Sequence, residues 1–201
     1  MIRSIIRTAV AGALVTGAVL AGGSAASAQP LFEPLQPIQQ LDVQRYMGDW
    51  WQIAAVPQPF NIDCAKDTRA NYQLLDANNV RVQNNCTRWD GAGNQIIGNA
   101  RVNDPVTRAQ LHVSFPGVPT QDNPEGPTNY IVTYIADDYS WALVGDPFRT
   151  SGFVLSRSPQ VSTDQWKQIR SVVESRGYNA CLLLTSPTTE GSNEIRPLCT
   201  V

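Results

Sequence analysis

Apolar and polar side chains alternate in several short stretches of the chain. Between Thr68 and Leu75 every second position is apolar (Ala70, Tyr72 and Leu74), and the positions between them are polar. This alternation is typical of a β-strand with one buried face. The same reasoning, with Gly, Pro, Asn and Asp marking the turns, predicts eight strands at residues 50–56, 68–75, 80–84, 95–102, 109–115, 130–136, 140–144 and 152–156.

The first of these strands begins after Gly48 and ends before Pro57. Only glycine tolerates a positive φ without steric cost, so Gly48 suits the change from a turn to a strand. Proline donates no hydrogen bond to a sheet ladder, so Pro57 stops the strand. A short helical turn at residues 43–46, with Asp42 as its N-cap, is expected to lead into it.

The period of the apolar positions changes after residue 161. Apolar residues then recur at helical spacing, at Trp166, Ile169, Val172 and Val173. We predict a helix that begins near residues 162–164 and ends at Gly177, with its apolar stripe packed against the outside of the sheet. A short final strand is predicted at residues 182–184, followed by a polar tail.

Eight consecutive strands, joined mostly by short turns, predict an antiparallel meander. A meander of this length leaves two unpaired edges unless it closes on itself. The expected fold class is therefore all-β, an eight-stranded antiparallel up-and-down β-barrel with one C-terminal α-helix packed outside. Residues 116–129 contain four prolines and are predicted to form the one long loop between strands.

The N-terminal residues differ from the rest of the chain. Residues 1–28 combine an early positive charge, an uncharged apolar run and an A-x-A site that ends at Ala28, which is the pattern of a secretory signal peptide. The alternative, a retained membrane anchor, is disfavoured because the run is short. Residues 29–40 are predicted to be an extended surface leader and residues 41–201 one domain. Cleavage near Ala28 predicts a protein that is secreted or held in the cell envelope.

The charge balance and the reactive residues argue against several classes of protein. The chain has 15 basic and 17 acidic side chains, with no basic stripe that would suit nucleic acid. His112 is the only histidine, and strand parity points it outward, where it is expected to be a surface residue. Neither a Ser-His-Asp site nor a histidine ligand inside the barrel is then expected. We predict no catalytic residue, no metal and no cofactor.

The four cysteines, Cys64, Cys86, Cys181 and Cys199, all follow the predicted signal peptide. An even number in an oxidising compartment favours two disulfides. A zinc site is disfavoured because the spacings are long and no C-x-x-C occurs. Four cysteines allow three connectivities, and their spacing does not choose between them.

Local strings in five places resemble the lipocalin family, and within it the bacterial lipocalins and apolipoprotein D-like proteins. The strings are D-V-Q-R-Y-M-G-D-W at 42–50, A-N-Y-Q-L at 70–74, R-A-Q-L-H-V-S-F at 108–115, D-Y-S-W-A-L-V at 138–144 and L-S-R-S-P at 155–159. The resemblance covers residues 41–187, in the order and spacing of the family. Two features depart from it: no cysteine follows the apolar run for lipid attachment, and Phe153 stands where relatives carry Trp.

The resemblance implies a structural pair and a disulfide pattern. In lipocalins the Trp of the first motif closes the barrel floor and the Arg of the third lies across its ring; Trp50 and Arg157 match these positions. A guanidinium over an indole contributes about 1–2 kcal/mol when partly desolvated. By the same resemblance Cys64 would pair with Cys199, which leaves Cys86 with Cys181.

An eight-stranded barrel is wide enough to hold one small ligand. Strand alternation predicts a mostly apolar, ligand-binding lining that consists of Tyr72, Leu74, Val82, Asn84, Leu111, Val113, Phe115 and Phe153. The family resemblance and this lining predict a carrier of a small hydrophobic or amphiphilic ligand, such as a fatty acid or a lysophospholipid.

Several alternatives to the carrier stay open. These residues could simply fill a small core, or the barrel could be a scaffold whose open-end loops bind another protein. A lipocalin-like enzyme is a further, less favoured class. No nucleic-acid partner is expected, a peripheral contact with a membrane stays open, and the chain could be a monomer or a dimer.

Overall fold

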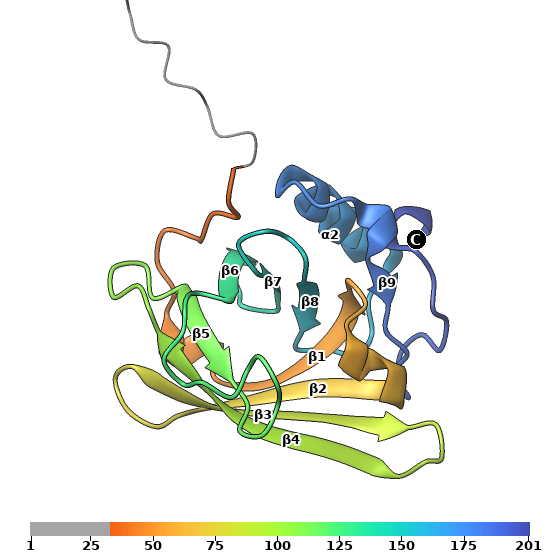
Figure 1. The fold of residues 1–201 in the computed structure, drawn as a ribbon. Helices are drawn as coiled ribbons and strands as arrows, with labels where there is room; N and C mark the ends of the chain where they lie inside the picture. The colour runs from red at the N-terminus through yellow and green to blue at the C-terminus, as the bar shows by residue number, and fades with distance from the viewer. Residues whose placement is uncertain (1–32) are drawn as a thin grey trace, which may run out of the picture. The chain divides into compact units, whose positions relative to one another are not determined.

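Eight of the nine strands close into a barrel in the computed structural model, which describes residues 33–201 (Figure 1). The predicted signal peptide and the first residues of the predicted leader lie outside the described residues, and residues 34–201 form one unit. Strands pair antiparallel in the order β2-β3-β4-β5-β6-β7-β8-β1-β9, and β2 also pairs with β1, which closes the ring. This confirms the predicted fold class.

The strands are β1 Gly48–Ala55, β2 Cys64–Leu74, β3 Asn79–Arg88, β4 Gly93–Val102, β5 Gln110–Ser114, β6 Tyr130–Ile135, β7 Trp141–Gly145, β8 Gly152–Ser156 and β9 Leu184–Thr185. The helices are α1 Val43–Tyr46 and α2 Thr163–Ser175, and three short 3₁₀ helices are η1 Pro59–Asp63, η2 Ala180–Leu182 and η3 Leu198–Thr200. Figure 1 shows α2 against the outside of the barrel, beside β9.

The start of β1 follows the prediction closely. Asp42 caps α1 by accepting the backbone N–H of Arg45 with its Oδ1 (3.1 Å), and Gly48 has a φ of +92°. One edge of β1 pairs with β8. The other pairs with β2 from Gly48 to Trp51 and with β9 at residues 54–55. The extra strand β9 therefore continues the pairing of β1 where β2 has diverged from it.

Apolar side chains pack in two layers, one inside the barrel and one outside it. The inner cluster includes Trp50 and Val132, and the outer one lies between the barrel wall and α2. As predicted, α2 directs its apolar stripe toward the sheet and buries Trp166, Ile169 and Val173. Because β7 is covered on both faces, all of its residues are buried and the strand lacks polar alternation.

Two peripheral segments differ from their predictions. The leader is not simply a surface segment, since Leu35 is 2% exposed and donates its N–H to Pro147 O (2.9 Å). The predicted final strand at residues 182–184 is displaced, because η2 ends at Leu182 and β9 begins at Leu184. No helix within residues 33–201 is long and apolar enough to cross a membrane.

The disulfide pairing implied by the family resemblance is wrong. Cys64 pairs with Cys86, and Cys181 pairs with Cys199. β2 begins at Cys64 opposite Arg88 of β3, so the hairpin register brings the Cα atoms of Cys64 and Cys86 to 5.6 Å. Cys181 on η2 and Cys199 on η3 have their Cα atoms 4.8 Å apart. Each bridge closes a local loop, which typically stabilises a fold by about 3 kcal/mol.

Candidate functional site

The barrel encloses a cavity of about 500 Å³. All eight barrel strands contribute to its wall, from Gln52 on β1 to Leu155 on β8. Most of the wall is apolar, with amide side chains such as Asn84 and Asn129 among the polar groups. The barrel is therefore not filled by its own side chains. The cavity has the size of sites that hold small ligands, roughly 300–1,000 Å³.

Seven of the eight residues predicted to line the lumen are in the cavity wall, namely Tyr72, Val82, Asn84, Leu111, Val113, Phe115 and Phe153. Leu74 is not among the lining residues; it packs, partly buried, against the inner cluster. The prediction missed other wall residues, including Val80, Ala100, Val144 and Leu155. Val80 and Leu155 each lie two positions from a predicted residue, so the same alternation carried one step further along β3 and β8 predicts them.

Three tyrosine hydroxyls meet in the wall of the cavity. The Tyr130 hydroxyl lies 2.7 Å from that of Tyr46 and 3.2 Å from that of Tyr72. Burial raises the pKa of Tyr72 to about 12 and the pKa values of Tyr46 and Tyr130 well above the ordinary value, because a phenolate loses its hydration there. All three hydroxyls are therefore protonated at neutral pH. We call these three residues the tyrosine cluster.

Strand alternation identified only Tyr72 of the tyrosine cluster. Tyr46 belongs to α1, outside every strand, and Tyr130 is the first residue of β6. Tyr130 lies two positions before Val132, which is part of the inner cluster, so parity within β6 was an available signal for Tyr130. For Tyr46 no periodic pattern exists, because α1 has only four residues.

Trp50 and Arg157 form the contact that the family resemblance implies. The Arg157 Cζ lies 3.7 Å from the centroid of the fully buried Trp50 ring. The guanidinium also donates to the backbone oxygens of Arg45, Met47 and Asp49 at 2.7–2.8 Å. A helix end leaves such carbonyls without intrahelical partners. Arg157 therefore joins α1 and the start of β1 to the end of β8, which closes this end of the barrel.

The opposite end carries exposed apolar side chains on its connections. Phe60 of η1 stacks on Phe153 of the cavity wall with ring centroids 6.2 Å apart. The Trp89 Nε1 donates to Ile62 O (2.8 Å). We call Phe60, Ile62, Trp89 and Phe148 the rim residues; each is between 48% and 75% exposed.

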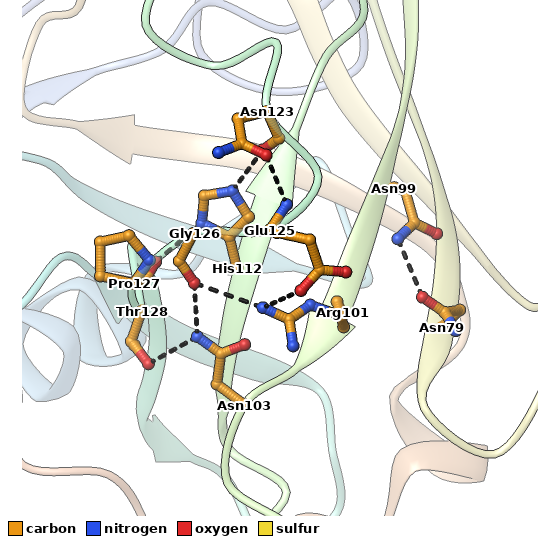
Figure 2. Close-up of polar contacts among 10 residues, drawn as sticks. All are labelled: Asn79, Asn99, Arg101, Asn103, His112, Asn123, Glu125, Gly126, Pro127 and Thr128. Carbon is orange, nitrogen blue, oxygen red and sulfur yellow. Dashed lines mark hydrogen bonds and ion pairs between the residues drawn. The ribbon is translucent and has the colours of Figure 1, made fainter.

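The longest connection, between β5 and β6, folds back over the outer face of the barrel (Figure 2). The His112 Nδ1 lies 2.7 Å from Pro127 O and its Nε2 lies 2.8 Å from Asn123 O. His112 thus points out of the barrel as parity predicts, but it is not a surface residue, since the loop buries it to 6% exposure. Gly126 lies against the imidazole, where a Cβ atom would clash with the ring.

Two further side chains of the barrel wall bind the same loop (Figure 2). Asn103 donates to Gly126 O (3.1 Å), and Arg101 forms an ion pair with Glu125 (3.3 Å). On its other side the loop contributes Val118 and Gln121 to the cavity wall. The loop is therefore held from outside the barrel while part of it faces the lumen.

The arrangement suits the binding of an apolar chain with a polar end. Within residues 33–201 no group of three His, Cys, Asp or Glu side chains is placed to hold a metal ion, and all four cysteines form disulfides. Both ring nitrogens of His112 already contact backbone carbonyls. The cavity offers a mostly apolar surface whose polar groups include the tyrosine cluster, several amides and three charged side chains, Arg69, Arg108 and Asp146.

Comparison with known proteins agrees with this geometry. A family model described as a lipocalin-like domain matches residues 41–188. Temperature-induced lipocalin-1 of Arabidopsis thaliana is 33% identical over 157 residues, which cover 78% of this chain and 84% of that protein. The outer membrane lipoprotein Blc of Escherichia coli K12 is 32% identical over 143 residues, 71% of this chain and 76% of that protein.

A solved structure agrees in fold. Insecticyanin from the tobacco hornworm Manduca sexta aligns with a TM-score of 0.59 at 18% sequence identity and covers 80% of this chain and 86% of that chain. At this level of identity the likeness concerns the fold alone.

Proposed function

The chain belongs to the lipocalin family, whose members generally bind small hydrophobic ligands, and we propose that it binds and carries an amphiphile of the fatty-acid or lysophospholipid class. The ligand occupies the barrel lumen. The chain acts as a carrier and not as an enzyme. The observation that supports this most directly is the cavity of about 500 Å³, whose wall is mostly apolar.

The balance of forces in this cavity favours an amphiphile. Each methylene group moved from water to an apolar wall contributes about 0.8 kcal/mol, so an alkyl chain supplies most of the binding free energy. A few buried polar groups then orient the polar end. Asn84 and the tyrosine cluster are among the polar groups of the wall that suit this role.

We place the mature protein outside the cytoplasm, either secreted or in the cell envelope. The two disulfides are consistent with an oxidising compartment. The predicted signal peptide and the likeness to an outer membrane lipoprotein support the same assignment.

Phe153→Arg tests the proposal. Phe153 lies in the wall, partly buried, beside Phe60. An unpaired guanidinium at this position opposes the burial of an alkyl chain. We expect the affinity for a fatty acid, measured by displacement of a fluorescent probe, to fall beyond detection while circular dichroism still reports a folded barrel. The matched control is Ile97→Arg, at a position 47% exposed and outside the cavity wall, which should bind like the wild type.

Fatty-acid affinity that survives Phe153→Arg would contradict the lumen as the binding site. The scaffold alternative is separated by native mass spectrometry of the protein purified from its own host. A carrier retains an amphiphile of discrete mass. A protein that arrives without one, and that binds no added fatty acid, is better explained as a scaffold.

A further inference from the structure

The tyrosine cluster joins three separate parts of the barrel inside the lumen. Tyr46 comes from α1, Tyr72 from β2 and Tyr130 from β6, and all three side chains are in the cavity wall. Tyr130 is the central member, because its hydroxyl contacts the other two. Within residues 33–201 these three hydroxyls have no other hydrogen-bond partner.

A count of protons shows that this cluster cannot satisfy itself. Each phenol carries one proton to donate, and the two contacts between the hydroxyls use two of the three. Tyr130 can donate to either neighbour or accept from both, and in every arrangement one O–H proton is left without an acceptor. Because burial keeps the three phenols neutral at neutral pH, the unused proton is not lost by ionisation. A buried donor without a partner is unfavourable, so the site favours an incoming acceptor.

The surroundings of the cluster select the kind of acceptor. The charge of Arg157 acts on Tyr46 and Tyr72, which favours a negative or electron-rich oxygen and disfavours a cation. An alkylammonium group is also unsuited because it has donors and no acceptor.

The register of β1 places the two ends of such a ligand. Tyr72 is opposite Gly48 at the first residue of β1, whereas Phe153 is opposite Ala55 at its last. Phe153, in the wall of the cavity, thus lies toward the rim residues, away from the closed end. A ligand whose oxygen reaches the tyrosine cluster therefore has its alkyl chain directed toward the open end.

We propose that the tyrosine cluster is the head-group site of the lumen, where the unused hydroxyl proton binds the carbonyl or carboxylate oxygen of an amphiphile that enters head first. This rests on the proposed carrier function and adds to it the class of head group and the direction of the ligand. An amphiphile with only an ammonium head falls outside this class.

The decisive variant replaces all three tyrosines by phenylalanine, because single changes do not remove the unused proton. Tyr72→Phe leaves two hydroxyls joined by one hydrogen bond, so one hydroxyl proton is still without an acceptor. The triple variant has no hydroxyl. Four probes with similar chains report the difference: decanoic acid, methyl nonyl ketone, decylamine and undecane, each measured by displacement of the same fluorescent probe.

We expect the triple variant to bind decanoic acid and the ketone about tenfold more weakly than the wild type does. Undecane should bind both proteins alike, and Tyr72→Phe should keep most of the affinity for the ketone. If the triple variant loses affinity for decanoic acid alone, the site is specific for carboxylates. If it loses affinity for both decanoic acid and the ketone, the site binds carbonyl oxygens in general. Equal affinities of wild type and triple variant for all probes overturn the head-group site and leave the carrier standing. Failure of the wild type to bind any probe removes the carrier itself.

A measurement on the wild type covers the case in which the triple variant does not fold. The infrared carbonyl band of bound methyl nonyl ketone, isotope-labelled at the carbonyl, should shift to lower frequency than in hexane, because a donated hydrogen bond weakens the C=O bond. A band at its hexane position contradicts the proposal.

Discussion

The two ends of the barrel are built differently. At the closed end Trp50 is fully buried and Arg157 binds the backbone oxygens of Arg45, Met47 and Asp49. At the open end the rim residues are exposed, and the loop between β5 and β6 is held from outside the barrel. The contrast teaches that the closed end is fixed by a buried stacked pair, whereas the exposed surfaces that suit ligand exchange lie at the open end.

This contrast has a physical basis in how polar groups are satisfied. The closed end satisfies backbone carbonyls with a cation stacked on a fully buried indole. At the open end His112 holds the loop from the outer face, with its ring nitrogens beside the carbonyls of Asn123 and Pro127, so the inner face of the same loop stays available to the lumen. Changes at the closed end should therefore affect unfolding, and changes at the open end should affect ligand exchange.

Trp50→Ala should have the largest effect and tests the closed end directly. Removal of a fully buried indole leaves a cavity and also removes the surface on which Arg157 stacks. We expect the free energy of unfolding to fall by about 3–5 kcal/mol, while the intrinsic affinity of the folded fraction for a fatty acid changes little. Chemical denaturation measures the first and titration under folding conditions the second. An unchanged thermal melt contradicts the structural role of this pair.

The next largest effect should be a fall in the free energy of unfolding as the pH is raised into the alkaline range. The pKa of Tyr72 is raised from about 10 to about 12 in the folded state, so between these values only the unfolded chain releases the proton. Stability is therefore fully present below pH about 10 and falls as the pH rises to about 12, by about 3 kcal/mol from this residue.

Denaturation by urea across this pH range measures the fall, with Tyr72→Phe as the matched variant. The variant lacks this phenol and should lose less stability over the same range. If the wild type and the variant lose equal stability over this pH range, Tyr72 is not buried as a neutral phenol, and water reaches its hydroxyl.

The barrel itself could be predicted from the sequence because its strands obey simple rules. Alternation between 68 and 75, the breakers Gly48 and Pro57, and the change of period at α2 each act locally. The positions at which the strands end are harder to predict from the sequence. β3 was predicted to stop at Asn84 but continues to Arg88, because a long hairpin is held by backbone hydrogen bonds where the side-chain pattern has become polar on both faces.

The disulfide error has the same origin. A β2 that begins at Thr68 gives Cys64 no cross-strand partner, so strand alternation alone does not determine its pairing. In the structure Cys64 begins β2 and lies next to the end of β3, so the hairpin alone determines its pairing with Cys86.

The parts of the site that were missed depend on contacts between distant segments. Tyr46 and Tyr130 are 84 positions apart, and no local pattern indicates that their hydroxyls meet. The outward direction of His112 followed from parity, but its burial depends on how residues 116–129 fold back, which the sequence pattern does not specify.

His112→Phe tests the open end and should have a moderate effect. Phenylalanine keeps the aromatic volume but donates no hydrogen bond, so the loop loses the polar contact of the imidazole with its backbone carbonyls. We expect stability to fall by about 1–2 kcal/mol, amide hydrogens of residues 117–126 to exchange faster, and a bound fatty acid to dissociate several-fold faster.

Glu125→Gln is the matched control for this change, because the Glu125 side chain is 74% exposed and an ion pair with such a partner contributes little. It should leave both exchange and dissociation close to wild type. If His112→Phe instead accelerates amide hydrogen exchange in β1 and α1 as much as in the loop, the two ends of the barrel unfold together. The contrast between a stable closed end and an adaptable open end is then wrong.

Phe60→Ser should have the smallest effect on stability and separates the two ends most finely. Phe60 is 48% exposed, so its loss should change the free energy of unfolding by less than about 0.5 kcal/mol. Yet its ring stacks on Phe153 and borders the cavity, so affinity for a long-chain fatty acid should fall measurably. Phe148→Ser, another rim residue but outside the cavity wall, is the matched control and should keep full affinity. Equal losses for both variants would mean that the rim acts as one general apolar surface and that Phe60 has no special place at the entrance.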